Sequence, residues 1–175
     1  TLATALSLEP GNARLISADA LGAYLDGRID EAGRLLKRSL DLDPLRPATY
    51  RGLAMALLSA GDASDAEAAM RTALQLNPGM ISGYYWLGRA QLAAGRPDAA
   101  LESMRREVAD VYRLTGLAVV NHALGRSAES EAALQRLMVE VGEDAAYQFA
   151  EVHAFRGELD EAFKWLDRAY ELHDP

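Results

Sequence analysis

A repeat of 34 residues constrains this chain more than any other feature of its sequence. Prolines recur at that spacing and end the similar segments ALSLEP, SLDLDP and ALQLNP: Pro10, Pro44 and Pro78. Glycines recur with the same step, and then after 30 and 32 residues: Gly27, Gly61, Gly95, Gly125 and Gly157. A fixed period of this length is typical of architectures in which one small structural unit stacks on the next.

Each unit of the repeat predicts two short helices. Apolar residues at helical spacing precede the second glycine, at Tyr50, Leu53 and Leu57, and others follow it, at Ala66 and Met70. Glycine suits the left-handed turn between two helices, and proline cannot continue the second helix. We therefore expect an all-α chain of paired helices.

Five consecutive units, from Ala13 to about Pro175, resemble tetratricopeptide repeats. In that family a small residue lies where the paired helices cross, and this chain has one at each such position: Ala20, Ala54, Gly88, Ala118 and Ala150 in the first helices, and Ala32, Ala66, Ala100, Ser130 and Ala162 in the second. Two helices can approach to about 8 Å only where no bulky side chain separates them. The resemblance implies a right-handed α-solenoid of stacked antiparallel pairs, with larger residues around the crossings: Leu36, Met70, Met104, Leu134 and Leu166, and Leu53, Leu87, Leu117 and Phe149.

The resemblance also divides the chain into one array. Residues 1–12 resemble the second helix of a truncated unit, and the repeats are expected at 13–46, 47–80, 81–110, 111–142 and 143–175. Asp19 stands where the other units have Leu or Phe, and nothing in the sequence explains it. Glu107 replaces a small residue late in the third unit, whose step is also short, so we expect an irregular junction near Val108 to Arg113. The last 60 or so residues are similar to the repeats of large bacterial regulatory and signalling proteins.

Composition and motifs argue against several classes of function. The net charge is −8, and no basic stripe is evident, so we expect no direct binding to nucleic acid. The chain lacks cysteine, a phosphate-binding glycine loop, a G-x-S-x-G motif and an HExxH motif. His122 and His153 make an incomplete zinc set. We therefore expect no catalysis, no metal and no cofactor, and no apolar run is long enough for a membrane span.

The candidate site is a groove lined by the first helices, because solenoids curve and bind partners on the concave side. One face of these helices supplies aromatic and aliphatic residues with two arginines: Arg51, Met55, Leu58, Tyr85, Arg89, Leu92, Tyr112, His122, Tyr147 and Phe155. Such residues are enriched where proteins bind one another. The expected partner is a peptide or helix whose carboxylate meets Arg51 and Arg89. The chain lacks the lysine, asparagine and arginine set with which some relatives hold chaperone carboxyl termini.

Two interpretations of function stay open. The chain is either a non-catalytic interaction scaffold or a regulatory or self-association segment of a larger bacterial signalling or transcription-regulatory protein, with the groove occupied by another domain. The first residue is Thr1 and no polar capping helix closes either end, so we expect a fragment of a longer protein or a homodimer paired through its ends. Partner, pathway and compartment are not encoded in any recognisable signal.

Overall fold

The computed structural model describes residues 1–172, apart from the side chain of Ala3, and within them the chain is almost entirely helical. The helices of this part are α1 (Leu2–Leu8), α2 (Ala13–Leu25), α3 (Ile29–Leu42), α4 (Pro47–Ser59), α5 (Ala63–Leu76), α6 (Gly83–Ala93), α7 (Pro97–Arg106), α8 (Asp110–Ala123), α9 (Ser127–Glu140), the short 3-10 helix η1 (Gly142–Ala145), α10 (Ala146–Arg156) and α11 (Leu159–Leu172). The predicted α-solenoid is confirmed.

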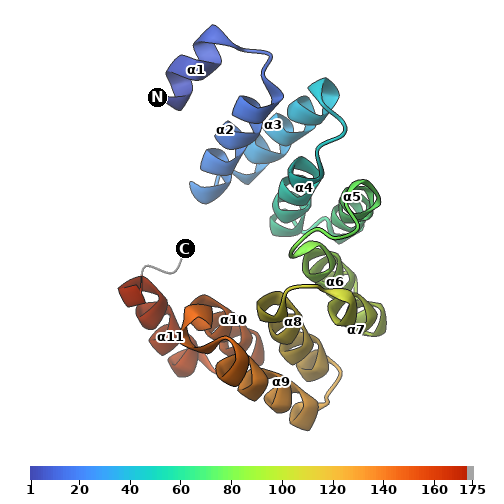
Figure 1. The fold of residues 1–175 in the computed structure, drawn as a ribbon, viewed down its shortest axis with the longest axis vertical. Helices are drawn as coiled ribbons and strands as arrows, with labels where there is room; N and C mark the ends of the chain where they lie inside the picture. Colours follow the sequence, from blue (N-terminus) through green and yellow to red (C-terminus); the bar gives the residue numbers. More distant parts are fainter. Residues whose placement is uncertain (173–175) are drawn as a thin grey trace.

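The helices pack as consecutive pairs that follow an arc (Figure 1). The pairs are α2 with α3, α4 with α5, α6 with α7, α8 with α9 and α10 with α11. The first helices of neighbouring pairs also contact one another, from α2 through to α10. They lie on the inner side of the arc, whereas α3, α5, α7 and α9 lie outside (Figure 1). We call the surface formed by α2, α4, α6, α8 and α10 the inner wall.

The repeated glycines make the turns inside the pairs. All five have a left-handed backbone, with φ between 72° and 85°. A left-handed backbone is unfavourable for any residue that has a Cβ atom, but not for glycine. The position of each turn can therefore be read from a glycine in the sequence. Pro47 and Pro97 occupy the first turn of α4 and α7, where a missing backbone N–H leaves no helical hydrogen bond unmade.

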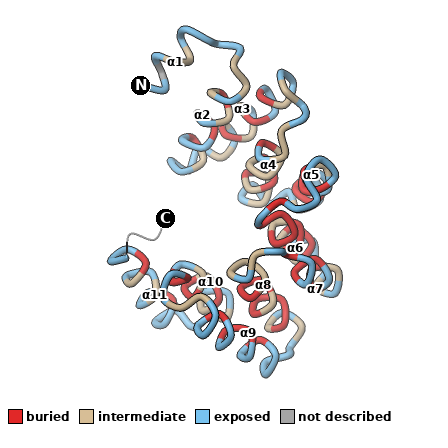
Figure 2. Tube along the Cα trace, in the orientation of Figure 1, coloured by how far each residue is buried: buried red, intermediate tan, exposed pale blue. Residues whose placement is uncertain are grey.

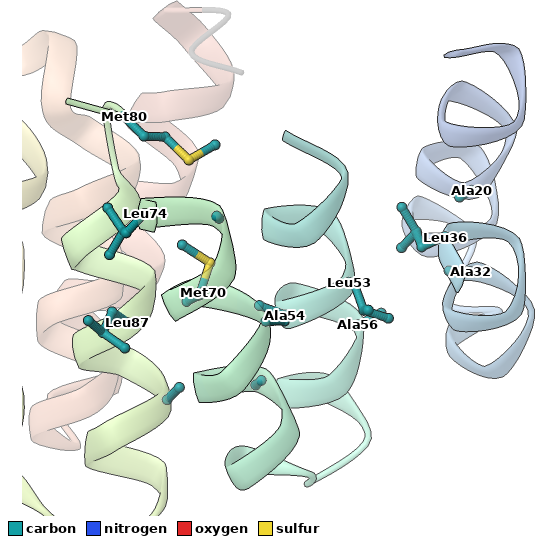
Figure 3. Packing of buried hydrophobic residues seen from close by; sticks show 14 of the residues in the cluster. Ala20, Ala32, Leu36, Leu53, Ala54, Ala56, Met70, Leu74, Met80 and Leu87 are labelled. Carbon is teal, nitrogen blue, oxygen red and sulfur yellow. The ribbon is translucent and has the colours of Figure 1, made fainter. Parts of the chain in front are cut away.

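The small residues at the expected crossings are all buried, and Figure 2 shows the burial concentrated where paired helices face each other. Figure 3 shows larger side chains of the same core, such as Met70 and Leu74, projecting between helices beside these alanines. Of the nine larger residues expected around the crossings, seven are buried and Leu117 is partly buried, whereas Leu166 is 41% exposed on α11. No further helix among the described residues covers that face.

Glu107 explains the irregular junction. Helix α7 ends at Arg106, one residue before Glu107, and α8 begins at Asp110. The junction is therefore 107–109, shorter than the expected stretch near Val108 to Arg113. The Glu107 side chain is 2% exposed, and its carboxylate accepts hydrogen bonds from the backbone N–H of Ser82 (3.0 Å) and Tyr85 (3.1 Å) at the start of α6. It also accepts from the N–H groups of the two residues after it. The carboxylate thereby caps α6, whose dipole favours negative charge there.

A second buried carboxylate joins α5 to the next pair. Glu67 is 3% exposed and accepts hydrogen bonds from Arg71 (2.6 Å), Gln91 (3.2 Å) and Arg96. Burial alone would raise the pKa of Glu67, but the hydrogen bonds from Arg96 and Gln91 and the charges of Arg71 and Arg96 outweigh it. The net pKa is lower than its ordinary value of 4.5. Glu67 is therefore held ionised at the contact between two repeats.

Candidate functional site

The ten residues expected in the groove lie on four consecutive helices of the inner wall, α4, α6, α8 and α10. Their exposure differs. Tyr147 and Phe155 on α10 are 49% and 44% exposed, whereas Tyr85 on α6 is only 3% exposed. The other seven are partly buried. The inner wall thus divides into a part that is filled by its own side chains and a part that is hollow.

The filled part is a group of four residues that we call the Tyr85 cluster: Tyr85, Arg89, Tyr112 and Glu151. The Tyr85 hydroxyl donates a hydrogen bond to the Glu151 carboxylate and accepts one from Arg89 Nη1 at 2.8 Å. Arg89 also forms an ion pair with Glu151. The Tyr112 ring packs against the Tyr85 ring, with 5.5 Å between their centroids. The cluster joins α6, α8 and α10 across 66 residues of sequence.

These contacts bear on two of the expected residues. Tyr85 does not offer open groove surface, because it is 3% exposed and its ring packs in the core with Ala100 and Met104. Arg89 already forms an ion pair with Glu151, so a partner carboxylate would have to compete with Glu151 for it. Burial raises the pKa of the Tyr85 hydroxyl to about 12, even though the charge of Arg89 acts in the opposite direction. The cluster therefore holds neutral Tyr85 and an ion pair at neutral pH.

The hollow part is a cavity of about 310 Å³ between α2 and α4. Its wall contains Leu21, Tyr24 and Met55 as apolar surface and three arginines, Arg14, Arg46 and Arg51, and we call it the arginine pocket. Among the residues that the structure describes, no Asp or Glu lines it. The volume is at the lower end of the roughly 300–1,000 Å³ found for ligand sites. Arg51 and Met55 were expected in the groove, whereas Arg14 and Arg46 were not.

Three hydroxyl groups fix the helices at the base of this pocket. Ser17 on α2 is hydrogen-bonded to Ser39 on α3 (2.8 Å) and to Thr49 on α4 (3.1 Å). The Ser39 hydroxyl also contacts the carbonyl oxygen of Ala13 at 2.8 Å. Because these residues are partly or fully buried, the network holds α2 and α4 at a defined separation. The hollow between the two helices is therefore bounded on one side by a connected set of polar contacts.

The three arginines of the pocket differ in their partners. Arg51 Nη1 donates a hydrogen bond to the Ser82 hydroxyl at 3.1 Å. Within residues 1–172, the side chain of Arg14 makes no hydrogen bond or ion pair, and Arg46 Nη1 is buried without an acceptor. A buried guanidinium N–H without a partner is costly, by roughly 1–3 kcal/mol. None of the three arginines thus pairs with an acidic side chain among residues 1–172.

Within residues 1–172, the histidines and the acidic residues do not assemble a metal site. The ring of His122 packs edge-on against Phe155, with 6.1 Å between their centroids, and His153 Nδ1 contacts Glu158 at 2.6 Å. No three His, Cys, Asp or Glu residues of the described chain are grouped so that they could hold a metal ion. No helix in residues 1–172 has the length and apolar character to cross a membrane.

Comparison with known proteins gives two sequence-profile matches, both described as tetratricopeptide repeat. One profile matches residues 23–70 and 57–107, and the other matches residues 85–141. No curated protein sequence matches the chain.

Several solved structures share the fold. TTC0263, a thermophilic TPR protein in Thermus thermophilus, is 23% identical with a TM-score of 0.73, and the match covers 91% of this chain and 90% of that one. YrrB, described as a TPR protein with an unusual peptide-binding site, is 18% identical with a TM-score of 0.64 and coverages of 98% and 91%. The first TPR of Spaghetti (RPAP3), bound to the HSP90 peptide SRMEEVD, is 19% identical with a TM-score of 0.54 and coverages of 74% and 93%.

Proposed function

Since this chain belongs to the tetratricopeptide repeat family, we propose that it is a non-catalytic interaction scaffold that binds a peptide or helix of a partner protein along its inner wall. The observation that carries the proposal is the arginine pocket, a hollow on the inner wall with apolar and cationic sides. Peptide binding by YrrB and by the RPAP3 repeat is consistent with it, as a property of those proteins.

The remaining inner wall supports the same function. Leu21 on α2 is 55% exposed, and Tyr147 and Phe155 expose similar fractions on α10. Large apolar side chains that face a shared concavity supply contact area to a ligand, and solenoids use this side for binding. The Tyr85 cluster between them links α6, α8 and α10, so this part of the wall is held together before a ligand arrives. Preorganisation of this kind reduces the entropy lost on binding.

A selection from a displayed library of random dodecapeptides tests this function. Peptides selected on the wild-type chain are expected to lose binding by roughly tenfold on the double variant Leu21→Ala and Phe155→Ala, which removes exposed apolar surface from the inner wall. The matched control is Leu42→Ala with Val139→Ala, which removes exposed apolar surface from second helices. Absence of any selected peptide, or equal losses in the two double variants, would contradict a groove on the inner wall.

A second candidate is the self-association or regulatory segment of a larger bacterial protein. The observation that favours it is the outer face of α11, where Leu159, Phe163, Leu166 and Tyr170 are 41–86% exposed. An apolar face of this kind marks an interaction site. Light scattering after gel filtration would then detect a wild-type dimer and a monomeric Phe163→Glu, Tyr170→Glu variant. A wild-type monomer at all concentrations would contradict self-association through α11.

A further inference from the structure

We propose that the arginine pocket is the anchor for an acidic segment of the partner: a carboxylate of an Asp or Glu side chain binds Arg14, Arg46 and Arg51, and a neighbouring apolar side chain of the same segment packs on Leu21, Tyr24 and Met55. This inference rests on the proposed scaffold function and names the chemistry of its ligand. It also moves the expected carboxylate contact from the Arg51 and Arg89 pair to the N-terminal end of the inner wall.

The distribution of cation partners carries the inference. Of the 18 Lys and Arg side chains, all of which lie in the described part of the chain, ten form an ion pair with Asp or Glu. Three of the remaining eight line this one cavity. In a chain with 26 acidic residues and a net charge of −8, a hollow with three arginines and no acid is a local reversal of the overall charge. A cavity of one sign concentrates ligands of the other.

The arginine side chains match the chemistry of a carboxylate. A guanidinium presents five N–H groups in a planar fork that matches two carboxylate oxygens. Arg51 uses one nitrogen on Ser82, which orients its side chain and leaves its other donors unused. Arg46 lies at the N-cap of α4, and its Nη1 is buried without an acceptor. Arg14 and Arg46 also line the cavity and form no ion pair with an acid of residues 1–172, so a bound carboxylate would meet no competing acid there.

The apolar side of the cavity favours a protein segment over a small inorganic anion. Phosphate offers nothing to Leu21, Tyr24 or Met55, whereas an acidic residue followed by Leu, Ile, Phe or Met would fill both sides. A long polyanion such as nucleic acid would have to pass the acidic surface of the remaining chain, which repels it. The occupant that fits is therefore a short acidic and apolar stretch of polypeptide.

The test uses the same dodecapeptide library with two further variants. Arg14→Ala with Arg46→Ala removes two side chains that make no hydrogen bond or ion pair in residues 1–172, so folding should be unaffected. Arg34→Ala with Lys37→Ala on the outer helix α3 removes two unpaired cations outside the pocket and changes the net charge equally. Circular dichroism melting of both variants checks that the fold is intact.

The expected result is that peptides selected on the wild type are enriched in Asp or Glu next to an apolar residue. Their affinity, measured by fluorescence anisotropy, should fall roughly tenfold or more on the pocket variant and less than about twofold on the α3 variant. Charge reversal by Arg14→Glu with Arg46→Glu should select basic peptides instead. Millimolar inorganic phosphate should not displace the wild-type peptides.

Four outcomes would overturn the inference. Selected peptides without acidic enrichment that still depend on Leu21 and Phe155 would leave the scaffold function intact and remove the acidic anchor. Equal losses of peptide affinity in the pocket variant and the α3 variant would show that the preference for acidic peptides comes from the net charge of the chain and not from the pocket. Displacement by phosphate would show that the pocket recognises a free anion. A library that yields no peptide on the wild type would contradict both proposals.

Discussion

Close packing between two repeats predicts that alanine in place of Gly116 lowers the stability of the fold, whereas alanine in place of the control residue Gly33 raises it. Gly88 on α6 and Gly116 on α8 lie on either side of the Met104 side chain, which is fully buried. A Cβ atom added to Gly116 would overlap Met104 Sδ and would lie 2.9 Å from its Cγ. Carbon atoms in favourable contact are about 3.5–4.0 Å apart. Gly116→Ala therefore requires Met104 to move, and on the Gly88 side there is no room for it.

The magnitude follows from two opposing terms. Inserting a methyl group into a filled core costs roughly 1–3 kcal/mol, and replacing a helical glycine by alanine gains roughly 0.5–1 kcal/mol. The contact between the added Cβ and Met104 is at the severe end of this range, so Gly116→Ala should lower the free energy of unfolding by about 2–2.5 kcal/mol. Gly33 on α3 has no atom within 4 Å of its added Cβ, so Gly33→Ala should raise it by about 0.5–1 kcal/mol.

Urea denaturation followed by circular dichroism at the helix band measures both changes. A third measurement isolates the clash: in the background of Met104→Ala, Gly116→Ala should become stabilising, because the sulfur atom that it meets is gone. If Gly116→Ala were as stable as the wild type in the presence of Met104, the reasoning that glycine sets the approach of α8 to α7 would be refuted.

The remaining predictions concern buried ionisable groups. Glu67→Ala should cost about 1.5–3 kcal/mol at neutral pH, because its hydrogen bonds to Arg96 and its other donors are charge-assisted. Since the folded pKa of Glu67 is lowered, this difference from the wild type should be complete above pH 4.5 and disappear as the pH falls through the lowered pKa; a difference independent of acid would contradict the ionised state. Glu107→Ala should cost about 1–3 kcal/mol by leaving the N–H of Ser82 and the start of α6 without an acceptor, and an unchanged urea midpoint would refute that capping role. Because burial raises the pKa of Tyr85, its contribution to the free energy of unfolding should be complete below pH 10 and should be lost between pH 10 and about 12. The same alkaline loss of stability in a Tyr85→Phe variant would contradict this assignment.

The fold could be predicted because it depends on local features that repeat. The left-handed turns require glycine, and the helix crossings require small residues. Both residue types recur at regular spacing, so the sequence shows them directly. Glu107 could also be suspected, since a charged residue stood where a small one was expected. Its role as a cap for the preceding helix α6 could not, because that depends on where the loop after α7 turns.

The candidate site could be predicted only in part, for a reason of geometry. Helical spacing gives the face of each first helix, and so it identifies Arg51 and Met55. It does not give the curvature that brings Glu151 on α10 to Arg89 and Tyr85 on α6. It also misses Arg46, which precedes the first turn of α4 and belongs to no helical face.

The curvature then determines which half of the inner wall can take a ligand. In the Tyr85 cluster a ligand carboxylate would have to displace Glu151 from Arg89. The attraction within this partly buried ion pair opposes that displacement. Among residues 1–172, no acidic side chain lines the arginine pocket, so none has to be displaced there. The same ligand group therefore gains more at α2 and α4 than at α6. For this reason an acidic partner should be anchored at the N-terminal end of the wall, with Tyr147 and Phe155 at the other end contacting its apolar residues.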